Sequence, residues 1–294
     1  MVAVAVALGA GLTHCSPVPA TASPSPSPSP SPKPAALWQP PVNATWQIEL
    51  YAPLNLPTTA STLTPAASIY DFDMFDNTNK TIATVHRLGA KVICYFSAGS
   101  YEPWRPDATS FKASDKGSAM DGWPDEAWLD IRSANVRAIM AKRIQLAAQK
   151  GCDAIDPDNV DGYQNDNGLG LTQADTVSFV RFLASTAAGY GLSTGLKNAG
   201  EVIPKVLDVV QFAVNEQCAA YSECATWQPF VKAGKPVLRI EYPSGAPKVT
   251  ATKRQSLCAA KGSTGFSTVL KKMSLDGWVM FCNGTTATTP TMTS

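Results

Sequence analysis

Eight short runs rich in β-branched, aromatic and other apolar residues recur after residue 45, and they constrain the fold of this chain more than any other feature. Turn residues and segments of helical period separate the runs, a pattern typical of a parallel sheet with crossover helices. The runs cover residues 46–51, 68–72, 92–96, 154–156, 192–196, 209–214, 237–241, and either 265–270 or its neighbour 278–281.

Two of the intervening segments place apolar residues at helical spacing. These positions are Val136, Ile139, Met140, Ile144 and Ala147 in the first, and Val177, Val180, Leu183, Ala184 and Ala187 in the second. Eight β/α units predict an α/β fold of one domain, a (β/α)8 TIM barrel. An open doubly wound sheet is the alternative, but no G-x-G-x-x-G follows the first strand to mark a dinucleotide turn.

The two ends of the chain differ in composition from the middle. Residues 1–16 begin with an apolar run too short for a membrane span and predict a secretory leader. Residues 17–43 contain an alternating Ser-Pro tract and predict a semi-rigid linker. We expect the catalytic barrel at 44–283 and a disordered Thr-rich tail at 284–294.

Seven cysteines become an even set of six if Cys15 leaves with the leader or carries a lipid, and even sets are typical of oxidised secreted domains. Cys218 and Cys224 are close enough in sequence to form a disulfide within one loop. Cys94 and Cys152 lie in predicted strands that we expect to be neighbours, so we expect them to pair as well. Cys258 and Cys282 then pair by remainder. We therefore expect a secreted, extracellular protein, with a lipid anchor at Cys15 as the alternative.

The formal net charge of +1 offers no field for nucleic acid or for an anionic membrane surface. The chemistry of a (β/α)8 barrel lies at the carboxyl ends of its strands, and the residues expected there are mostly acidic: Asp71, Asp73, Asp156, Asp158, Asp161, Glu216 and Glu241, with Lys197 as the base among them. Such an excess of carboxylates favours a cationic substrate. The alternative is that about half of these acids cap helix starts.

Histidine is too scarce for most hydrolytic sites. The two histidines are His14 and His86, and the second lies in a predicted helix at the far end of the barrel, so a nucleophilic triad and a zinc site are both disfavoured. Carboxylate chemistry remains. Three acids lie within residues 156–161, and a calcium site is one explanation for them. An EF-hand loop would need ligands at the positions of Val160 and Asn167, so we favour active-site carboxylates over a calcium site. Glu216 supplies a second acid from another strand end, as glycoside hydrolysis requires, unless it is an ordinary exposed loop acid.

Six segments resemble glycoside hydrolase family 114: IYDFD at 69–73, VICYFSAGSYE at 92–102, WPDEAWLDIR at 123–132, GCDAIDPDNVDGY at 151–163, GLKN at 195–198 and NEQC at 215–218. The resemblance extends over residues 46–282. That family contains endo-α-1,4-polygalactosaminidases built on TIM barrels, which cut galactosamine-rich microbial exopolysaccharide.

The resemblance implies an endo-acting hydrolase for an α-1,4-linked, at least partly de-N-acetylated galactosamine polymer. From the residues themselves we expect no metal and no cofactor. The resemblance assigns Asp158 as nucleophile and Glu216 as general acid/base of a retaining mechanism, with Asp156 as the alternative nucleophile or an orienting residue. We expect substrate-binding residues around them at Asp71, Asp73, Tyr95, Ser97, Trp104, Asp156, Asn159, Asp161, Tyr163, Lys197, Asn198, Asn215, Glu241 and Tyr242.

The segment from residue 98 to 131 is longer than an ordinary βα loop and carries Tyr101, Trp104, Trp123 and Trp128. We interpret it as a groove wall whose rings stack on sugars or cations. The alternative is that two of the three tryptophans pack the loop onto the barrel. Lys197 is expected to keep an aspartate ionised, or else to form a salt bridge without catalytic effect.

Two other functions fit the same pattern. One is a non-catalytic glycan-binding or matrix protein on the same barrel, which the presence of both acids argues against. The other is a glycosidase or deacetylase for another amino-sugar polymer, although a deacetylase normally needs a His/Asp metal site. We expect a monomer whose partner is the polysaccharide, without nucleic acid and without stable membrane insertion.

Overall fold

The computed structural model describes residues 1–3, 5 and 36–292. Cys15, the Ser-Pro tract and most of the predicted leader lie outside the described residues. None of the helices in the described part of the chain is long and apolar enough to cross a membrane.

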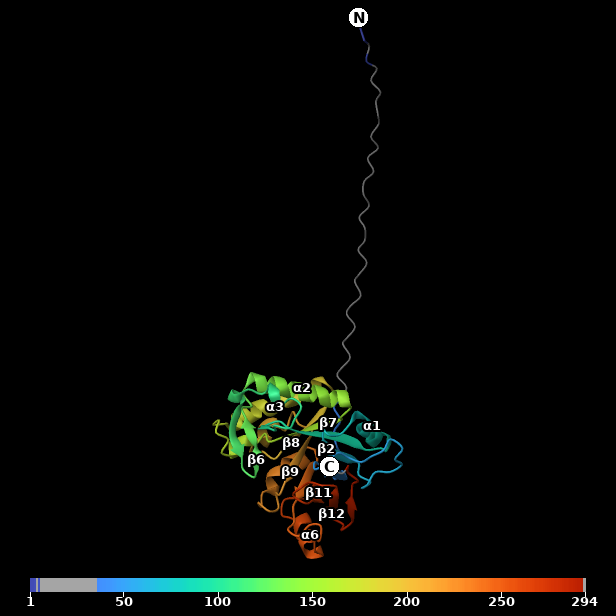
Figure 1. Ribbon diagram of the computed structural model, residues 1–294, viewed down its shortest axis with the longest axis vertical. Helices are drawn as coiled ribbons and strands as arrows, with labels where there is room; N and C mark the ends of the chain where they lie inside the picture. The colour runs from blue at the N-terminus through green and yellow to red at the C-terminus, as the bar shows by residue number, and fades with distance from the viewer. Residues whose placement is uncertain (4, 6–35, 293–294) are drawn as a thin grey trace. The chain divides into compact units, whose positions relative to one another are not determined.

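Eight parallel strands form the centre of the molecule, in the order β1-β2-β3-β7-β8-β9-β10-β11 (Figure 1). Their bounds are Trp46–Glu49 (β1), Ile69–Asp73 (β2), Lys91–Ser97 (β3), Ala154–Asp158 (β7), Ser193–Lys197 (β8), Phe212–Glu216 (β9), Val237–Glu241 (β10) and Ser267–Leu270 (β11). Each overlaps one of the runs predicted from the sequence. The eighth is β11, whereas residues 278–281 form an antiparallel neighbour.

The curled sheet closes between β1 and β11 through side chains. The Trp46 indole donates to the carbonyl of Ser267 at 2.8 Å, and the Lys271 ammonium donates to the carbonyl of Ile48 at 2.6 Å. Alternate residues such as Ile69, Ile93 and Val214 fill the interior, while their sequence neighbours pack outward against helices. The TIM-barrel fold predicted from the sequence is confirmed.

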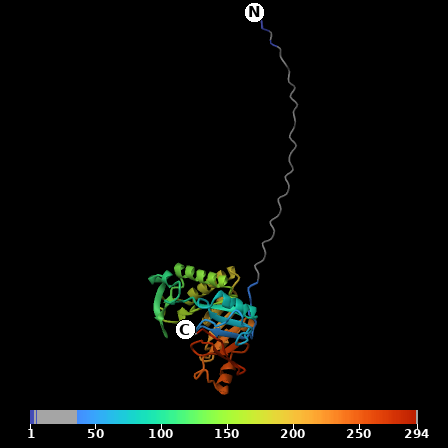
Figure 2. The ribbon, with the colours of Figure 1, turned by 45° about the vertical axis from the view of Figure 1, so that its right-hand side comes forward.

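Helices cover the outside of the barrel. They are α1 (Asn79–Arg87), α2 (Ala134–Lys150), α3 (Gln173–Gly189), α4 (Ile203–Val206), α5 (Gln228–Lys232) and α6 (Ala251–Cys258). The two long helices, α2 and α3, lie side by side (Figure 2), and Arg137 of α2 donates to Ser178 of α3 at 3.0 Å. The apolar positions predicted for them are buried, apart from the half-buried Val177. Ser133 and Thr172 cap their first turns.

The regular β/α alternation is broken in three places within the described residues. Residues 50–68, between β1 and β2, contain no helix. After β11, strands β12 (Trp278–Phe281) and β13 (Thr286–Thr288) extend the sheet in antiparallel fashion. Between β3 and α2 a separate antiparallel sheet forms, in the order β4-β6-β5, from Ser100–Tyr101 (β4), Lys116–Met120 (β5) and Trp123–Leu129 (β6).

Short 3-10 turns complete the connections. They lie at Ala108–Ser110, Ala113–Asp115, Gly162–Gln164, Gly200–Val202 and Cys224–Trp227. The first two belong to the segment 98–131, which is therefore a folded insert. Arg143 of α2 holds this insert to the barrel, because its guanidinium donates to both Asp107 carboxylate oxygens at 2.8 Å and to the carbonyl of Ser97 at 2.7 Å.

Within the described residues, three disulfides join the predicted pairs, Cys94–Cys152, Cys218–Cys224 and Cys258–Cys282. Cys94 lies in β3, but Cys152 lies in the turn before β7 and not in a strand.

The two predicted ends of the folded domain, residues 44 and 283, need correction. The folded domain begins by residue 36, where Gln39 already donates to the carbonyl of Gln211 at 2.6 Å. Residues 284–292 are not a disordered tail, because β13 pairs with β12 and Thr291 bridges to Leu54. The reason is that β-branched threonines suit an edge strand, and here they satisfy the open edge of β12.

Candidate active site

A cavity of about 1050 Å³ opens at the carboxyl ends of the parallel strands. The insert between β3 and α2 forms one of its walls through Trp104, Trp123 and Glu126. The predicted site residues that line it are Asp73, Tyr95, Trp104, Asp158, Asn159, Asp161, Lys197, Asn198, Glu216 and Tyr242.

Strand alternation places the central residues. Asp156 and Asp158 of β7 and Glu216 of β9 are in phase with inward apolar residues of their strands and so point into the barrel. Lys197 of β8 alternates with Leu196, which packs in the outer cluster, so Lys197 also points inward. The backbone turns sharply after three of them, because Asn159, Asn198 and Gln217 all have positive φ. Asn tolerates this conformation well, which explains the Asp-Asn and Lys-Asn pairs at the strand ends.

Lys197 lies at the floor of the cavity among three carboxylates. Its ammonium is 3.1 Å from Oδ2 of Asp156, 3.8 Å from Oδ2 of Asp158 and 4.0 Å from Oε2 of Glu216. Burial alone would lower the pKa of Lys197, but these carboxylates outweigh it and raise the pKa well above its usual range. The lysine therefore remains a cation, and both Asp158 and Glu216 lie beside the same positive charge.

Asp158 receives two further donors. The Tyr95 hydroxyl donates to its Oδ2 at 3.0 Å and the backbone N–H of Asn159 donates to its Oδ1 at 2.8 Å. The pKa of Asp158 lies above its usual value, mainly because the group is buried and also because Glu216 is close. The positive charge of Lys197 and the two hydrogen-bond donors oppose this rise. The donors and the cation fix the carboxylate in one orientation at the mouth of the barrel.

Glu216 is held by residues from both neighbouring strand ends. Asn198 donates to its Oε2 at 3.0 Å and accepts from its backbone N–H at 3.1 Å. The Tyr242 hydroxyl donates to its Oε1. Two carboxylates from different strands thus face one cavity with their rotations fixed, which is the arrangement that an acid/base pair requires.

Two further carboxyl groups that line the cavity, Asp161 and Glu126, have a pKa near neutral pH. Burial raises the pKa of Asp161 to about 7, with the neighbouring Asp158 adding to the rise. Burial likewise raises the pKa of Glu126 to about 7, although the Ser100 hydroxyl, which donates to it, opposes the rise. Both groups therefore change charge near neutral pH.

Asp73 faces the cavity as predicted, but it is already paired with a cation. The guanidinium of Arg105 donates to Asp73 at 2.6 Å and to Glu102 at 2.7 Å, and all three side chains are almost fully buried. Sequence reasoning missed Arg105, Glu102 and Glu126. They come from the insert, which was predicted as a groove wall, but no local pattern specified which of its charged residues reach the cavity.

Four predicted residues lie beneath or beside the cavity lining. Asp71 and Asp156 are wholly buried under its floor. Ser97 is buried as well, and its hydroxyl accepts from Asn159 at 2.9 Å. Tyr163 donates to Glu201, which lines the cavity in its place. Direct substrate contact, predicted for all four, does not fit the three buried residues, whereas for the half-buried Tyr163 it stays a prediction.

Asn215 and Glu241 point away from the cavity, which corrects the prediction that they bind substrate. Each lies one residue out of phase with an inward side chain of its strand, so alternation turns it outward. Glu241 accepts from the backbone N–H of Ala219 at 2.8 Å and lies 3.6 Å from Arg239. It lines a separate cavity of about 650 Å³ behind β10.

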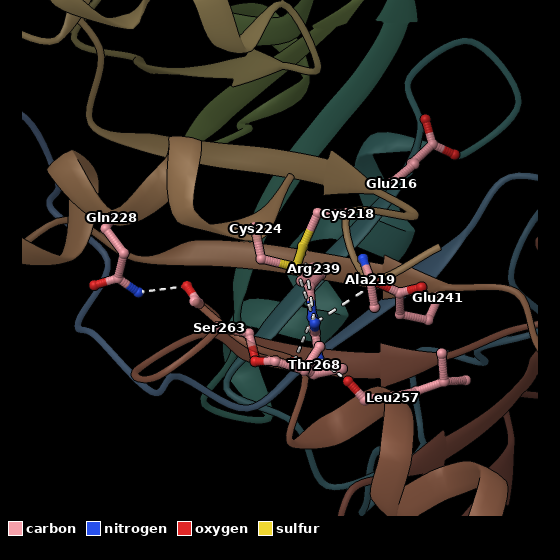
Figure 3. Close-up of a disulfide and its surroundings, with 12 residues drawn as sticks. Glu216, Cys218, Ala219, Cys224, Gln228, Arg239, Glu241, Leu257, Ser263 and Thr268 are labelled. Atoms are coloured by element: carbon pink, nitrogen blue, oxygen red, sulfur yellow. Dashed lines mark hydrogen bonds and ion pairs between the residues drawn. A yellow bond between two sulfur atoms is a disulfide. The ribbon is translucent and has the colours of Figure 1, made fainter. Parts of the chain in front are cut away.

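A disulfide shapes the loop that follows Glu216. Arg239 lies against the Cys218–Cys224 bridge, with its Nη1 atom 3.4 Å from the sulfur of Cys224, and Glu216 points away from the bridge (Figure 3). Within this loop Gln217 and Tyr221 line the large cavity. The bridge therefore anchors one cavity wall.

Exposed aromatic rings surround the cavity. Trp104 and Trp123 are 56% and 58% exposed, and Tyr51 and Tyr221 on other walls are 67% and 69% exposed. Trp128 is buried and packs the insert, so one of the three tryptophans has the packing role that the sequence allowed for two. Tyr51 and Tyr221 were not predicted, because single tyrosines in loops carry no local signal.

Comparisons with known proteins agree with this geometry. The model of glycoside-hydrolase family GH114 matches residues 27–287. The crystal structure of Aspergillus fumigatus Ega3 in complex with galactosamine is 54% identical, with a TM-score of 0.79, covering 84% of this chain and 98% of that one. The glycoside hydrolase domain of PelA from Pseudomonas aeruginosa is 16% identical, with a TM-score of 0.60, covering 79% of this chain and 95% of that domain, and shares the fold. No curated protein sequence matches the chain.

Proposed function

The chain belongs to glycoside-hydrolase family GH114, and from this premise we propose that it is an endo-α-1,4-polygalactosaminidase that cleaves galactosamine-rich polysaccharide. The observation that carries the proposal is the pair of carboxylates, Asp158 and Glu216, that approach one buried ammonium from two strand ends. The similar protein Ega3 was crystallised with galactosamine.

In the proposed reaction Asp158 attacks the anomeric carbon while Glu216 gives its proton to the departing glycosidic oxygen. A water molecule, deprotonated by Glu216, then hydrolyses the glycosyl-enzyme ester and regenerates Asp158, so that the anomeric configuration is retained. Asp158 suits the nucleophilic role because Tyr95, the Asn159 N–H and Lys197 stabilise its anion. Asp156, wholly buried and bound to Lys197, supports that arrangement from below.

The charge of the cavity favours a cationic glycan. The lining carboxyls are Asp73, Asp76, Glu102, Glu126, Asp158, Asp161, Glu201, Glu216 and Glu223, and the lining bases are Arg105 and Lys197. Both bases already pair with carboxylates. The remaining negative charge is available to ammonium groups of a de-N-acetylated polymer, which links the substrate to the electrostatics of the site.

The exposed rings favour an internal cut in a long chain. Trp104 and Trp123 stand on the insert, whereas Tyr51 and Tyr221 follow β1 and β9. Rings on different walls offer stacking surfaces to several sugars at once, including sugars remote from the cleaved bond. Binding on both sides of that bond is what endo-acting cleavage needs.

Three disulfides suit an oxidising compartment, so we place the enzyme outside the cell, as a secreted protein or, alternatively, lipid-anchored through Cys15. We further propose that it acts as a monomer, because the catalytic pair and its supporting residues all come from one chain.

The decisive experiment is incubation with purified, partly de-N-acetylated α-1,4-galactosaminan, with products analysed by mass spectrometry. Wild type should release oligosaccharides, and Asp158→Asn and Glu216→Gln should each lose at least about a thousandfold in rate while keeping the thermal midpoint within a few degrees. Binding without cleavage by wild type would identify a glycan-binding protein. Cleavage of another amino-sugar polymer in its place would assign a different glycosidase.

Substrate charge has its own test. Fully N-acetylating the same polymer removes its positive groups without changing the linkage. We expect productive binding to weaken markedly, and equal rates on both forms would contradict the electrostatic part of the proposal.

A further inference from the structure

Asp71 is a buried carboxyl group that the proposed reaction does not use. It is the central residue of β2, points into the barrel and is wholly inaccessible to solvent. Neither of its carboxyl oxygens has a hydrogen-bond donor among the described residues, and Oδ1 of Asp156 likewise has none. Unpaired buried oxygens of this kind are costly, so three of them at one place need an explanation.

Among the described residues, Asp71 forms no salt bridge with a cation. On one side Ile48 of β1 and on the other Ile93 of β3 are its register partners, and both belong to the apolar interior of the barrel. The charged groups that act on it are Asp156 and Asp158 of β7 and Lys197 of β8. Lys197 donates to Asp156 at 3.1 Å and lies between Asp158 and Glu216.

Two ionised carboxylates side by side in this apolar layer would repel each other with little screening. Burial raises the pKa of Asp71 well above its usual range, and the adjacent Asp156 carboxylate raises it further. Burial raises the pKa of Asp156 to about 6, and the Lys197 ammonium, which donates to Asp156 at 3.1 Å, opposes this rise. Both acids are buried on inward-facing strand positions, and both have carboxyl oxygens without a donor among the described residues, so one proton shared between them would satisfy oxygens on both.

We propose that Asp71 is kept as the neutral carboxylic acid and donates a hydrogen bond to Asp156, which makes it a positioning residue for the glycosidase reaction. The inference rests on the proposed function. The Asp71 hydroxyl fixes Asp156, the Asp156 carboxylate fixes the Lys197 ammonium, and that ammonium sits between the nucleophile and the acid/base. Asp71 touches no substrate.

The proton on Asp71 also matters for charge at the site. If Asp71 were ionised, Lys197 would be shared among more negative charges, and the added repulsion would favour protonation of Asp158, the proposed nucleophile. A neutral Asp71 orients Asp156 without adding charge. An apolar residue in its place would fill the space but leave the Asp156 oxygen without a donor.

Infrared difference spectroscopy of the folded full-length chain tests the protonation state directly. At pH 7 the wild type minus Asp71→Asn spectrum should contain the carbonyl band of a protonated carboxyl group, and the band should persist up to pH 8. A difference spectrum that shows a carboxylate in its place would overturn the proposal. This measurement does not depend on any catalytic activity.

Kinetics test the positioning role. Asp71→Ala, which removes the donor, should lower kcat about tenfold with KM changed less than about twofold, and should move the acidic limb of the pH profile. Asp71→Asn, whose amide donates without charge, should restore most of the lost kcat. Asp156→Asn, which removes the carboxylate that holds Lys197, should be worse than either. Equal losses in the two Asp71 variants, or a loss confined to KM, would contradict the role.

Two controls separate the possible failures. Thermal unfolding of each variant shows whether a loss of rate reflects a loss of fold, and if Asp71→Ala does not fold, the infrared result and the Asp71→Asn variant decide the case. Wild-type turnover in Asp158→Asn or Glu216→Gln would instead refute the proposed catalytic pair and leave the protonation state of Asp71 as a separate finding.

Discussion

The Tyr95 hydroxyl donates a 3.0 Å hydrogen bond to the Oδ2 atom of Asp158, the same oxygen that lies 3.8 Å from the Lys197 ammonium. Tyr95 and Asp158 lie on adjacent strands, because β3 and β7 pair in parallel with Ser97 opposite Asp158 and Tyr95 two residues earlier in β3. The phenol therefore stabilises the anion of the proposed nucleophile from one side while the lysine does so from below.

Removing this phenol should impair the nucleophile. Because the Tyr95 hydrogen bond lowers the pKa of Asp158, Tyr95→Phe should raise that pKa and move the acidic limb of the kcat/KM profile to higher pH. We expect kcat to fall about tenfold to a hundredfold, as for the loss of a hydrogen bond to a charged group. Tyr242→Phe, which removes the donor to Glu216, is the matched comparison. An unchanged acidic limb in Tyr95→Phe would contradict this role.

Affinity for the cationic polymer should depend on pH through Glu126 and Asp161. Burial raises the pKa of each to about 7, so below that pH both are neutral and above it both are anions. As the pH rises through about 7 they gain attraction for ammonium groups, and KM should fall relative to the double variant Glu126→Gln/Asp161→Asn. Wild type and double variant are measured on the same polymer, so any change in the charge of its amines with pH affects both proteins equally.

The control for that measurement is Asp125→Asn, which removes an exposed carboxylate beside Glu126 on β6 but outside the cavity. Its KM should follow the wild-type pH dependence. If the double variant also follows it, these two groups do not govern binding.

The tryptophans of the insert should matter more for long substrates than for short ones. Trp104→Ala and Trp123→Ala each remove an exposed ring from the cavity wall. Each variant should raise KM for the polymer several-fold, since stacking is worth about 1 kcal/mol at exposed sites. The rate on the shortest cleaved oligosaccharide should change little. Tyr190→Ala removes an exposed ring outside the cavity and should have no effect. Equal losses on both substrates would place the rings at the cleaved bond.

The disulfides should contribute unequally to stability and to activity. Cys94–Cys152 closes a separation of 58 residues and Cys218–Cys224 one of 6, so replacing both cysteines by alanine should cost about 4 kcal/mol in the first case and about 2 kcal/mol in the second. The second pair anchors the loop that carries Gln217 and Tyr221 into the cavity, and its loss should reduce kcat/KM more. Chemical denaturation tests whether the loss of stability is larger without Cys94–Cys152, and turnover tests whether the loss of kcat/KM is larger without Cys218–Cys224. The opposite order in either measurement would contradict the corresponding prediction.

Much of the fold could be predicted from local patterns. Short β-rich runs separated by helical-period segments specified eight strands and the two long helices, because side-chain alternation and apolar period depend on residues near one another in the chain. The sequence indicated that either 265–270 or 278–281 forms the eighth strand. The structure shows that the first of these segments pairs in parallel with β10, whereas the second pairs antiparallel with β11. That choice is made by non-local hydrogen bonding.

The insert shows where local patterns failed. Its residues were predicted as a long loop, yet β4, β5 and β6 pair with one another and Arg143 of α2 ties the segment to the barrel. That folding delivers Arg105 to Asp73 and Glu126 to the cavity. Contacts between side chains from remote segments have no signature within a window of sequence.

By itself the sequence predicted that acidic residues end several parallel strands, that carboxylates carry the chemistry, and that six cysteines pair as three bridges. Tertiary structure decided which acids share the cavity: Asp158 and Glu216 turn inward beside Lys197, whereas Glu241 turns outward to Arg239. It also decided that Asp71 is buried in the barrel interior, with no donor to either carboxyl oxygen among the described residues. The physical reason is that the identity of a strand-end residue is local, but the face it occupies and the charges it meets depend on strand register and barrel closure, which join residues far apart in the chain.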